Sequence, residues 1–265
     1  MSKNKKEIDK LRDDEYYYNG SKSKYFNTSE VKKLKTDTYK QFEVPMDSSH
    51  AFEFGKLFHT MVLEKDKLNL FPIYEGKTRS GKEFVKFCED NNIEDKKTAL
   101  LIADYEKAEE MTVSLLRNPI LRDEIMSDSN LYEEPMIGEI QGHEKLFKCK
   151  ADIITKKGLI IDLKSTACVS IDQFVRKGTY DLGYDVQAYI YSTLFNKPFK
   201  FIAVSKTKRF YKDGDFYYDV FNCSVSDETI LRGKQKVTQA LELWEQWHGP
   251  NKLYDMKESY YNQSF

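Results

Sequence analysis

The sequence lacks any apolar run near the roughly 20 residues that a membrane-spanning helix needs. Residues 1–18 are charged throughout and lack the apolar stretch of a secretory signal. We therefore expect a cytoplasmic protein with no membrane partner. An excess of either charge is also missing, because 42 Lys and Arg stand against 43 Asp and Glu. This balance excludes a uniformly basic protein that coats nucleic acid, although a local basic groove is compatible with it.

Cysteine is scarce, with four residues and no CxxC pair. Zinc ribbons need such pairs, and the gaps between the four cysteines match none of the usual iron–sulfur spacings. In a reducing cytoplasm we expect free thiols that pack as small apolar residues. The four are Cys88, Cys149, Cys168 and Cys223.

Apolar residues are plentiful, because 40% of the 265 residues are hydrophobic and 14% are aromatic, which is enough for a sizeable interior. Residues 1–24 are polar, and we expect them to be ordered only in part. Residues 25–265 are predicted to form one domain. Within it, a mainly helical part at 25–130 precedes an α/β core at 131–225, and a helix with a tail closes the domain at 226–265.

The spacing of apolar residues supports this division. Spacings of three and four after capping residues predict helices in the first part, and alternation predicts strands after residue 132. The order of strand, strand, helix and strand predicts an α/β (α+β) fold in which helices flank a central mixed sheet. The predicted helices start at Asn27 or Thr28, start at Ser48 or Ser49, span 97–118 up to Pro119, start at Ser170, and span 184–195 and 227–247; the predicted strands span 136–140, 146–154, 159–165, 199–205 and 216–223.

The predicted strand at 159–165 carries the most informative polar residues. Side chains alternate between the two faces of a strand, so Asp162 and Lys164 must project from the same side. A short hairpin can bring Asp152 of the preceding strand alongside them. Burying these charges is costly unless a partner compensates, and Mg²⁺, which prefers carboxylates, water and phosphate oxygens, would do so. The alternative is an ordinary Asp–Lys ion pair on an exposed edge strand.

Two predicted helices repeat a four-residue spacing. Gly55 and His59 share one helical face, and a close approach of another backbone or a substrate would explain a glycine inside a helix. A neutral His59 could ligate a metal, although a lone histidine on an apolar face also fits a packed core residue. Gln187 and Tyr191 have the same spacing and, taken alone, fit ordinary hydrogen bonds between helices.

Taken in order, these residues resemble the PD-(D/E)xK nuclease superfamily in its RecB/RecE-like branch, and most closely the catalytic domains of phage and prophage exonuclease VIII (RecE). The resemblance covers roughly residues 25–200 and implies a restriction-endonuclease-like core. One departure is Ala151, where proline often stands, at a position that varies in the superfamily. The motifs are Gly55-x-x-x-His59 within Phe54–Glu64, Asp152 within Cys149–Ile154, Asp162-x-Lys164 within Ile161–Thr166, and Gln187-x-x-x-Tyr191.

The resemblance implies a role for each matching residue. Lys164 would orient the attacking water or help to deprotonate it. The implied ligands of the catalytic metal are Asp152, Asp162, the carbonyl of Leu163, and His59.

Three further residues complete the implied site. An additional upstream acid would be Glu134, with Glu133 as a close rival. Gln187 and Tyr191 would position the DNA backbone or brace the site.

By the same resemblance we expect a Mg²⁺-dependent exonuclease, with Mn²⁺ able to substitute, that degrades the 5′ strand of duplex DNA from an end. It would leave 3′ single-stranded tails for recombination. A phage or prophage in a bacterial host is the implied source. The implied partners are duplex DNA ends, further copies of the chain in a homo-oligomeric ring, and a single-strand annealing protein.

Two alternatives to this function stay open. One is another RecB-like nuclease that acts with a helicase or in CRISPR adaptation, although such proteins often carry a four-cysteine cluster that the spacing here does not support. The other is a DNA-binding protein of the same fold without turnover, against which the intact Asp152, Asp162 and Lys164 set argues.

One segment imitates a phosphate-binding loop. Gly76–Lys82 fits half of the motif, but Glu83 stands where a hydroxyl must ligate Mg²⁺, and Pro72 interrupts the preceding strand pattern. We expect no nucleoside triphosphate there. The basic residues of this segment and of 206–209 remain candidates for DNA phosphate contacts, and residues 16–18 for stacking on bases.

Overall fold

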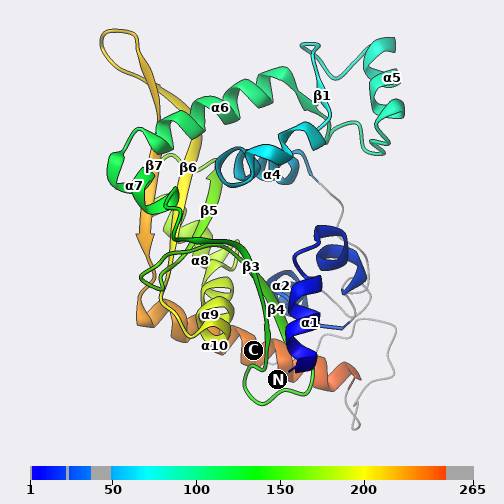
Figure 1. The fold of residues 1–265 in the computed structure, drawn as a ribbon, viewed down its shortest axis with the longest axis vertical. Helices are drawn as coiled ribbons and strands as arrows, with labels where there is room; N and C mark the ends of the chain where they lie inside the picture. The colour runs from blue at the N-terminus through cyan, green and yellow to red at the C-terminus, as the bar shows by residue number, and fades with distance from the viewer. Residues whose placement is uncertain (1, 22–23, 37–48, 249–265) are drawn as a thin grey trace, which may run out of the picture.

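A five-stranded mixed sheet forms the centre of the protein (Figure 1). The computed structural model describes residues 2–21, 24–36 and 49–248. Strands follow the order β3-β4-β5-β6-β7, in which β5 and β6 are parallel and the other neighbours are antiparallel. This confirms the mixed sheet. The strands are β3 (Leu131–Gly138), β4 (Phe147–Ile154), β5 (Ile160–Thr166), β6 (Phe199–Phe210) and β7 (Phe216–Ser224).

Along the chain, helices precede the five strands, lie between β5 and β6, and follow β7. None of them, over the described ranges, is both long and apolar enough to cross a membrane. They are α1 (Ser2–Lys10), α2 (Thr28–Thr36), α4 (His50–Leu63), α5 (Lys82–Asp90), α6 (Ile102–Leu116), α7 (Pro119–Ile125), α8 (Ile171–Tyr180), α9 (Tyr184–Phe195) and α10 (Asp227–His248), with the short elements η1 (Tyr16–Gly20), η2 (Lys65–Leu70), β1 (Ile73–Tyr74) and β2 (Leu100–Leu101).

Side-chain caps fix where three of the helices begin, as their sequences predict. Asn27 and Glu30 each accept a hydrogen bond of 3.0 Å from the other's backbone N–H at the start of α2. Ser49 and Ser170 accept from the third residue of α4 and of α8. The helix predicted at 97–118 is shorter, because β2 takes the place of its first turn and pairs with β1.

The segment that imitates a phosphate-binding loop connects β1 to α5. A two-residue strand therefore does lead into it, contrary to the prediction from Pro72. Its Arg79 is engaged within the protein, because the guanidinium donates to Asp104 at 2.9 Å and to the Ala99 carbonyl at 2.9 Å.

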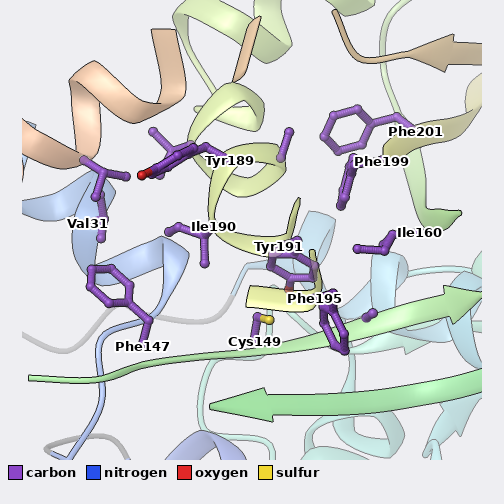
Figure 2. Packing of buried hydrophobic residues seen from close by; sticks show 14 of the residues in the cluster. Val31, Phe147, Cys149, Ile160, Tyr189, Ile190, Tyr191, Phe195, Phe199 and Phe201 are labelled. Atoms are coloured by element: carbon purple, nitrogen blue, oxygen red, sulfur yellow. The ribbon is translucent and has the colours of Figure 1, made fainter. Parts of the chain in front are cut away.

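Two apolar clusters cover the two faces of the sheet. Alternate residues of a strand point to opposite faces, and β6 accordingly sends Phe201 to one cluster and Ile202 to the other. The first cluster joins the sheet to α2, α9 and α10, and Figure 2 shows Ile190 and Tyr191 of α9 above Cys149 of β4. The second joins the opposite face to α4, α6 and α7. The sheet therefore lies between two helical layers.

The sheet opens between β4 and β5. These strands pair only at Ile153 with Ile161 and at Ile154 with Ile160, and then they separate. Figure 1 shows β3 and β4 curving away from the other strands toward α1. We call this opening the β4–β5 fork. Beyond these two pairs, the backbone N–H and C=O groups of β4 and β5 that face the fork do not bond to each other. They can therefore form hydrogen bonds with side chains.

Candidate active site

Asp152 of β4 and Leu163 of β5 face each other in the fork. The Leu163 N–H, which no strand pairs on this side, donates a 2.7 Å hydrogen bond to Asp152 Oδ2. An extended residue directs its N–H and C=O to the same side of the strand. The Leu163 carbonyl, which the family resemblance implies as a metal ligand, therefore also faces the fork.

His59 and Glu133 join Asp152 from two other elements. His59 Nε2, on α4, lies 3.1 Å from Asp152 Oδ2 and 3.4 Å from Glu133 Oε1 on β3. One ligand atom from each of the three residues fits within a span of 4.8 Å. Helix α4 is held against the sheet by apolar neighbours of His59 such as Phe58, which is fully buried.

The backbone of Glu133 explains why its side chain reaches this cluster. Its φ of 50° lies in the left-handed region, whereas its neighbours Tyr132 and Glu134 pair regularly with β4. That register leaves Glu133 directly across from Asp152. A left-handed non-glycine residue costs about 1–3 kcal/mol, and such residues cluster at functional sites.

Glu133, and not Glu134, is the acid that the fold brings to the cluster. Both oxygens of Glu134 accept hydrogen bonds from the Arg12 guanidinium, at 2.8 and 2.9 Å. The structure therefore favours Glu133, the close rival, over Glu134 for the place of the upstream acid. Regular alternation cannot reveal the left-handed turn at Glu133, which redirects the side chain.

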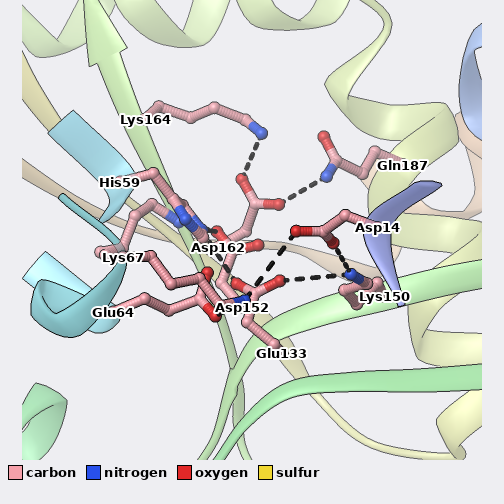
Figure 3. A network of polar contacts seen from close by, with 11 residues as sticks. Asp14, His59, Glu64, Lys67, Glu133, Lys150, Asp152, Asp162, Lys164 and Gln187 are labelled. Carbon is pink, nitrogen blue, oxygen red and sulfur yellow. Dashed lines mark hydrogen bonds and ion pairs between the residues drawn. The ribbon is translucent and has the colours of Figure 1, made fainter. Parts of the chain in front are cut away.

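Asp162 and Lys164 project from the same side of β5, as alternation predicts (Figure 3). Lys164 Nζ lies 2.5 Å from Asp162 Oδ1, and Gln187 Nε2 of α9 donates to Asp162 Oδ2 at 2.5 Å. Asp162 is only 2% exposed. Asp162 Oδ1 is buried, accepts no hydrogen bond from any described residue and lies against the Lys164 ammonium. Asp162 therefore stands beside the cluster of His59, Glu133 and Asp152.

The charges of the site shift the pKa of each titratable group. Burial alone would lower the pKa of His59, but the carboxylates of Asp152 and Glu133 raise it to about 9. Burial, followed by the charge of Asp152, raises the pKa of Glu133 to about 8. The pKa of Asp152 lies below its ordinary value, because His59 and the Leu163 N–H outweigh burial.

Asp162 and Lys164 form a second coupled pair. Burial raises the pKa of Asp162 to about 6, although the Lys164 ammonium opposes this rise. Burial by itself would lower the pKa of Lys164, but Asp162 and Asp152 raise it overall. Lys164 is therefore an ammonium at neutral pH.

Tyr191, the last residue of the four motifs, lies in the core behind the carboxylates. Tyr191 is buried in the first apolar cluster, where its ring contacts Phe199 at a centroid distance of 5.7 Å. Burial raises the pKa of its hydroxyl. The structure thus brings Gln187 to the carboxylates and leaves Tyr191 in the core behind them.

Several charged residues of the site carry no recognisable motif. Lys150 contacts Asp14 and lies 3.9 Å from Glu133 Oε2 (Figure 3). Alternation along β4 could have placed Lys150 beside Asp152, but Asp14 is 136 residues away in sequence and gives no local signal. Glu64 and Lys67, which pair with each other, border the cluster on the side of α4.

The cluster of His59, Glu133 and Asp152 fits a divalent cation. It offers an imidazole nitrogen and carboxylate oxygens, a donor set that suits Mg²⁺ or Mn²⁺. Glu133 Oε1 is buried and accepts no hydrogen bond from any described residue. Leaving a buried carboxylate oxygen without a donor is costly, and an ion would remove that cost.

The four cysteines are free, and none contributes to the site. Three of them are buried, and burial raises the pKa of the Cys149 thiol well above its ordinary value. The prediction of unpaired cysteines that pack in the interior is confirmed for these three.

Comparison with known proteins gives one family and a shared fold. A family model described as a PDDEXK-like domain of unknown function (DUF3799) matches residues 20–252. A "putative exonuclease" from Eubacterium rectale has a TM-score of 0.59 and 17% identity, over 91% of this chain and 90% of that chain. A phage-related exonuclease from Haemophilus somnus 129PT has a TM-score of 0.34 and 15% identity, over 84% of this chain and 94% of that chain. Among curated proteins none matches.

Proposed function

This chain belongs to the family of PDDEXK-like domains, and we propose that it is a Mg²⁺-dependent exonuclease that acts on double-stranded DNA. One observation carries the proposal: acids from three strands, a histidine and a lysine converge at a single opening of the sheet. The residues are His59, Glu133, Asp152, Asp162 and Lys164.

Each side chain has a distinct task in phosphodiester hydrolysis. His59, Glu133 and Asp152 would hold a divalent cation, with the Leu163 carbonyl beside them. When bound, such a cation stabilises charge on phosphoryl oxygens and makes a water more acidic. The other catalytic tasks would fall to Asp162 and Lys164 of β5.

Lys164 supplies positive charge where negative charge develops on the phosphate. Its raised pKa keeps Lys164 an ammonium, which would donate hydrogen bonds to the attacking water or the phosphate. Asp162 fixes the direction of the ammonium, and Gln187 fixes Asp162 in turn. The pair is therefore oriented before a substrate arrives, which avoids reorganisation during the reaction.

The direction and context of cleavage follow from the resemblance to exonuclease VIII. We propose cleavage of the 5′ strand from a duplex end, a homo-oligomeric ring around DNA, and a single-strand annealing protein as partner. These features would place the enzyme in recombination within a phage or prophage.

Cleavage of labelled DNA tests the function. Linear duplexes labelled at the 5′ or the 3′ end, and covalently closed circles, are incubated with Mg²⁺ or with EDTA. We expect nucleotides to be released from linear DNA with Mg²⁺ but not with EDTA, and the 5′ label to be lost before the 3′ label. Cleavage of closed circles would instead indicate an endonuclease, and binding without any cleavage would indicate a DNA-binding protein.

A further inference from the structure

The N-terminal segment of the chain packs against the strands that carry two of the proposed metal ligands. Leu11, which is fully buried, and Tyr17 of η1 form an apolar cluster with Ile137 of β3. Lys148 of β4 donates a hydrogen bond to the Tyr17 carbonyl. Figure 1 shows α1 beside β3. Residues 2–19 precede the part of the chain that the family model matches, so the family motifs say nothing of them.

Asp14 of this segment contacts a buried lysine of the site. Lys150 of β4 is 7% exposed, and its ammonium donates a hydrogen bond to Asp14 Oδ1. The same ammonium lies 5.0 Å from the ring centroid of Tyr17. The other oxygen of Asp14 lies 3.9 Å from Lys67 Nζ. The N-terminal segment thereby holds the ammonium of Lys150 from one side (Figure 3).

Lys150 in turn faces Glu133, the acid with the left-handed backbone. Glu133 Oε2 lies 3.9 Å from Lys150 Nζ, whereas Glu133 Oε1 lies 3.4 Å from His59 Nε2. The carboxylate is thus held between an ammonium and an imidazole. Alternate residues of a strand share a face, so Lys150 projects from β4 on the same side as Asp152. The contacts therefore form a chain from Asp14 through Lys150 to Glu133.

The charge of Lys150 does not explain its place in the site. An ammonium close to a ligand carboxylate repels a metal ion, and burying the ammonium has a cost. What Lys150 can provide is direction, because a carboxylate that is already aligned loses less freedom when it binds an ion. Residues behind the ligands of a metal commonly have this task. On β5, Gln187 and Asp162 orient Lys164 by a similar chain of contacts.

We propose that Asp14 and Lys150 are positioning residues, which hold the Glu133 carboxylate in the orientation that binds the metal ion. The inference rests on the proposed function, since the ion belongs to the proposed nuclease site. It adds to that function a role for the N-terminal segment, which none of the family motifs includes. Asp14 acts through Lys150, and Lys150 acts through Glu133, so both act away from the reacting atoms.

Binding of Mn²⁺ to the full chain without DNA tests this chain of contacts, by titration calorimetry and by the shift of the unfolding midpoint. K150M removes the ammonium and keeps an unbranched side chain, and D14A removes the acid that accepts its hydrogen bond. The matched controls are D9A, at an exposed acid of α1, and K157M, in the exposed turn between β4 and β5. Cleavage of linear duplex DNA is measured in parallel at increasing Mn²⁺ concentrations.

We expect D14A and K150M each to weaken Mn²⁺ binding about tenfold, the usual effect of losing a residue behind a metal ligand. The Mn²⁺ concentration for half-maximal cleavage should rise by the same factor, and kcat at saturating Mn²⁺ should stay close to the wild-type value. D9A and K157M should bind Mn²⁺ as the wild type does. In E133Q, which lacks the ligand, D14A should add no further loss.

Three results contradict the inference. The first is wild-type Mn²⁺ affinity in folded D14A or folded K150M. The second is tighter binding by K150M, which the loss of its charge alone would cause. The third is a further loss when D14A is added to E133Q. If K150M does not fold, D14A decides, because the Asp14 side chain is 54% exposed and its removal leaves the interior intact.

Failure of the proposed function would give a different pattern. A wild-type protein that binds Mn²⁺ but cleaves no DNA would refute the nuclease function, and the binding data would still decide the roles of Asp14 and Lys150. A wild-type protein that binds no Mn²⁺ would refute the metal site and this inference with it.

Discussion

The three-residue cluster of His59, Glu133 and Asp152 holds two carboxylates at close range. Repulsion between them is visible in the pKa of Glu133, which burial and Asp152 raise to about 8. Glu133 also keeps a left-handed φ and a buried oxygen without a hydrogen bond. Each of these features lowers stability, and together they are typical of a site that is maintained for a ligand.

The neighbouring acids Glu133 and Glu134 offer a matched pair of variants. We expect E133Q to raise the Mg²⁺ or Mn²⁺ concentration for half-maximal cleavage at least about tenfold, because it removes a ligand. The thermal stabilisation by Mn²⁺ should shrink in parallel. Without metal, E133Q should unfold no earlier than wild type, since it removes a repelling carboxylate.

E134Q is the control, because it loses only a partly exposed ion pair with Arg12, which is worth less than about 1 kcal/mol. It should keep the wild-type metal requirement. Metal titrations of cleavage and of the unfolding midpoint check both variants. A larger metal defect in E134Q than in E133Q would contradict the assignment of the upstream acid.

At the scale of elements, the contact of α9 with α10 positions Gln187 and Tyr184. The helices approach so closely that a Cβ on Gly233 would lie 2.1 Å from the Asp185 carbonyl oxygen. Lys236 of α10 also binds the same turn of α9, through an ion pair with Asp185. The geometry of Asp162 therefore depends on a packing contact outside the site.

Two glycine-to-alanine variants distinguish the α9–α10 contact from the general effect of alanine on helix stability. We expect G233A to lower the free energy of unfolding by about 2 kcal/mol, because the added carbon forces the helices apart. G55A should be neutral or stabilising by up to about 1 kcal/mol, since the nearest atom to its Cβ is Ser165 Oγ at 3.8 Å. Urea unfolding measures both. Equal stability of the two variants would show that α9 and α10 pack less tightly than the 2.1 Å approach at Gly233 implies.

Local signals in the sequence predict the elements better than their arrangement. The caps at Asn27, Ser49 and Ser170 and the alternation along β4 and β5 depend on neighbouring residues, and the structure confirms them. The β4–β5 fork and the left-handed Glu133 depend on how distant strands pair. Neither has a sequence pattern of its own.

At the scale of the whole molecule, the site joins segments that are far apart in the chain. His59 comes from the helical part, Glu133 and Asp152 from the curved strands, and Asp162 with Gln187 from the sheet and its covering helix. The order of the motifs predicted that these residues form one site, but only the family resemblance indicated how they are arranged. Asp14 belongs to no motif, so the sequence could not place it at the site.

The most direct test of the proposed active site is single-turnover nucleotide release from linear duplex DNA with Mg²⁺. We expect release by the wild-type protein, and a loss of at least about 100-fold in Asp162→Ala and in Lys164→Ala. Lys164 stabilises negative charge on the reacting phosphate, and Asp162 orients Lys164. Circular dichroism should show unchanged folding. Full activity in either folded variant would contradict the proposal that the β4–β5 fork is the catalytic centre.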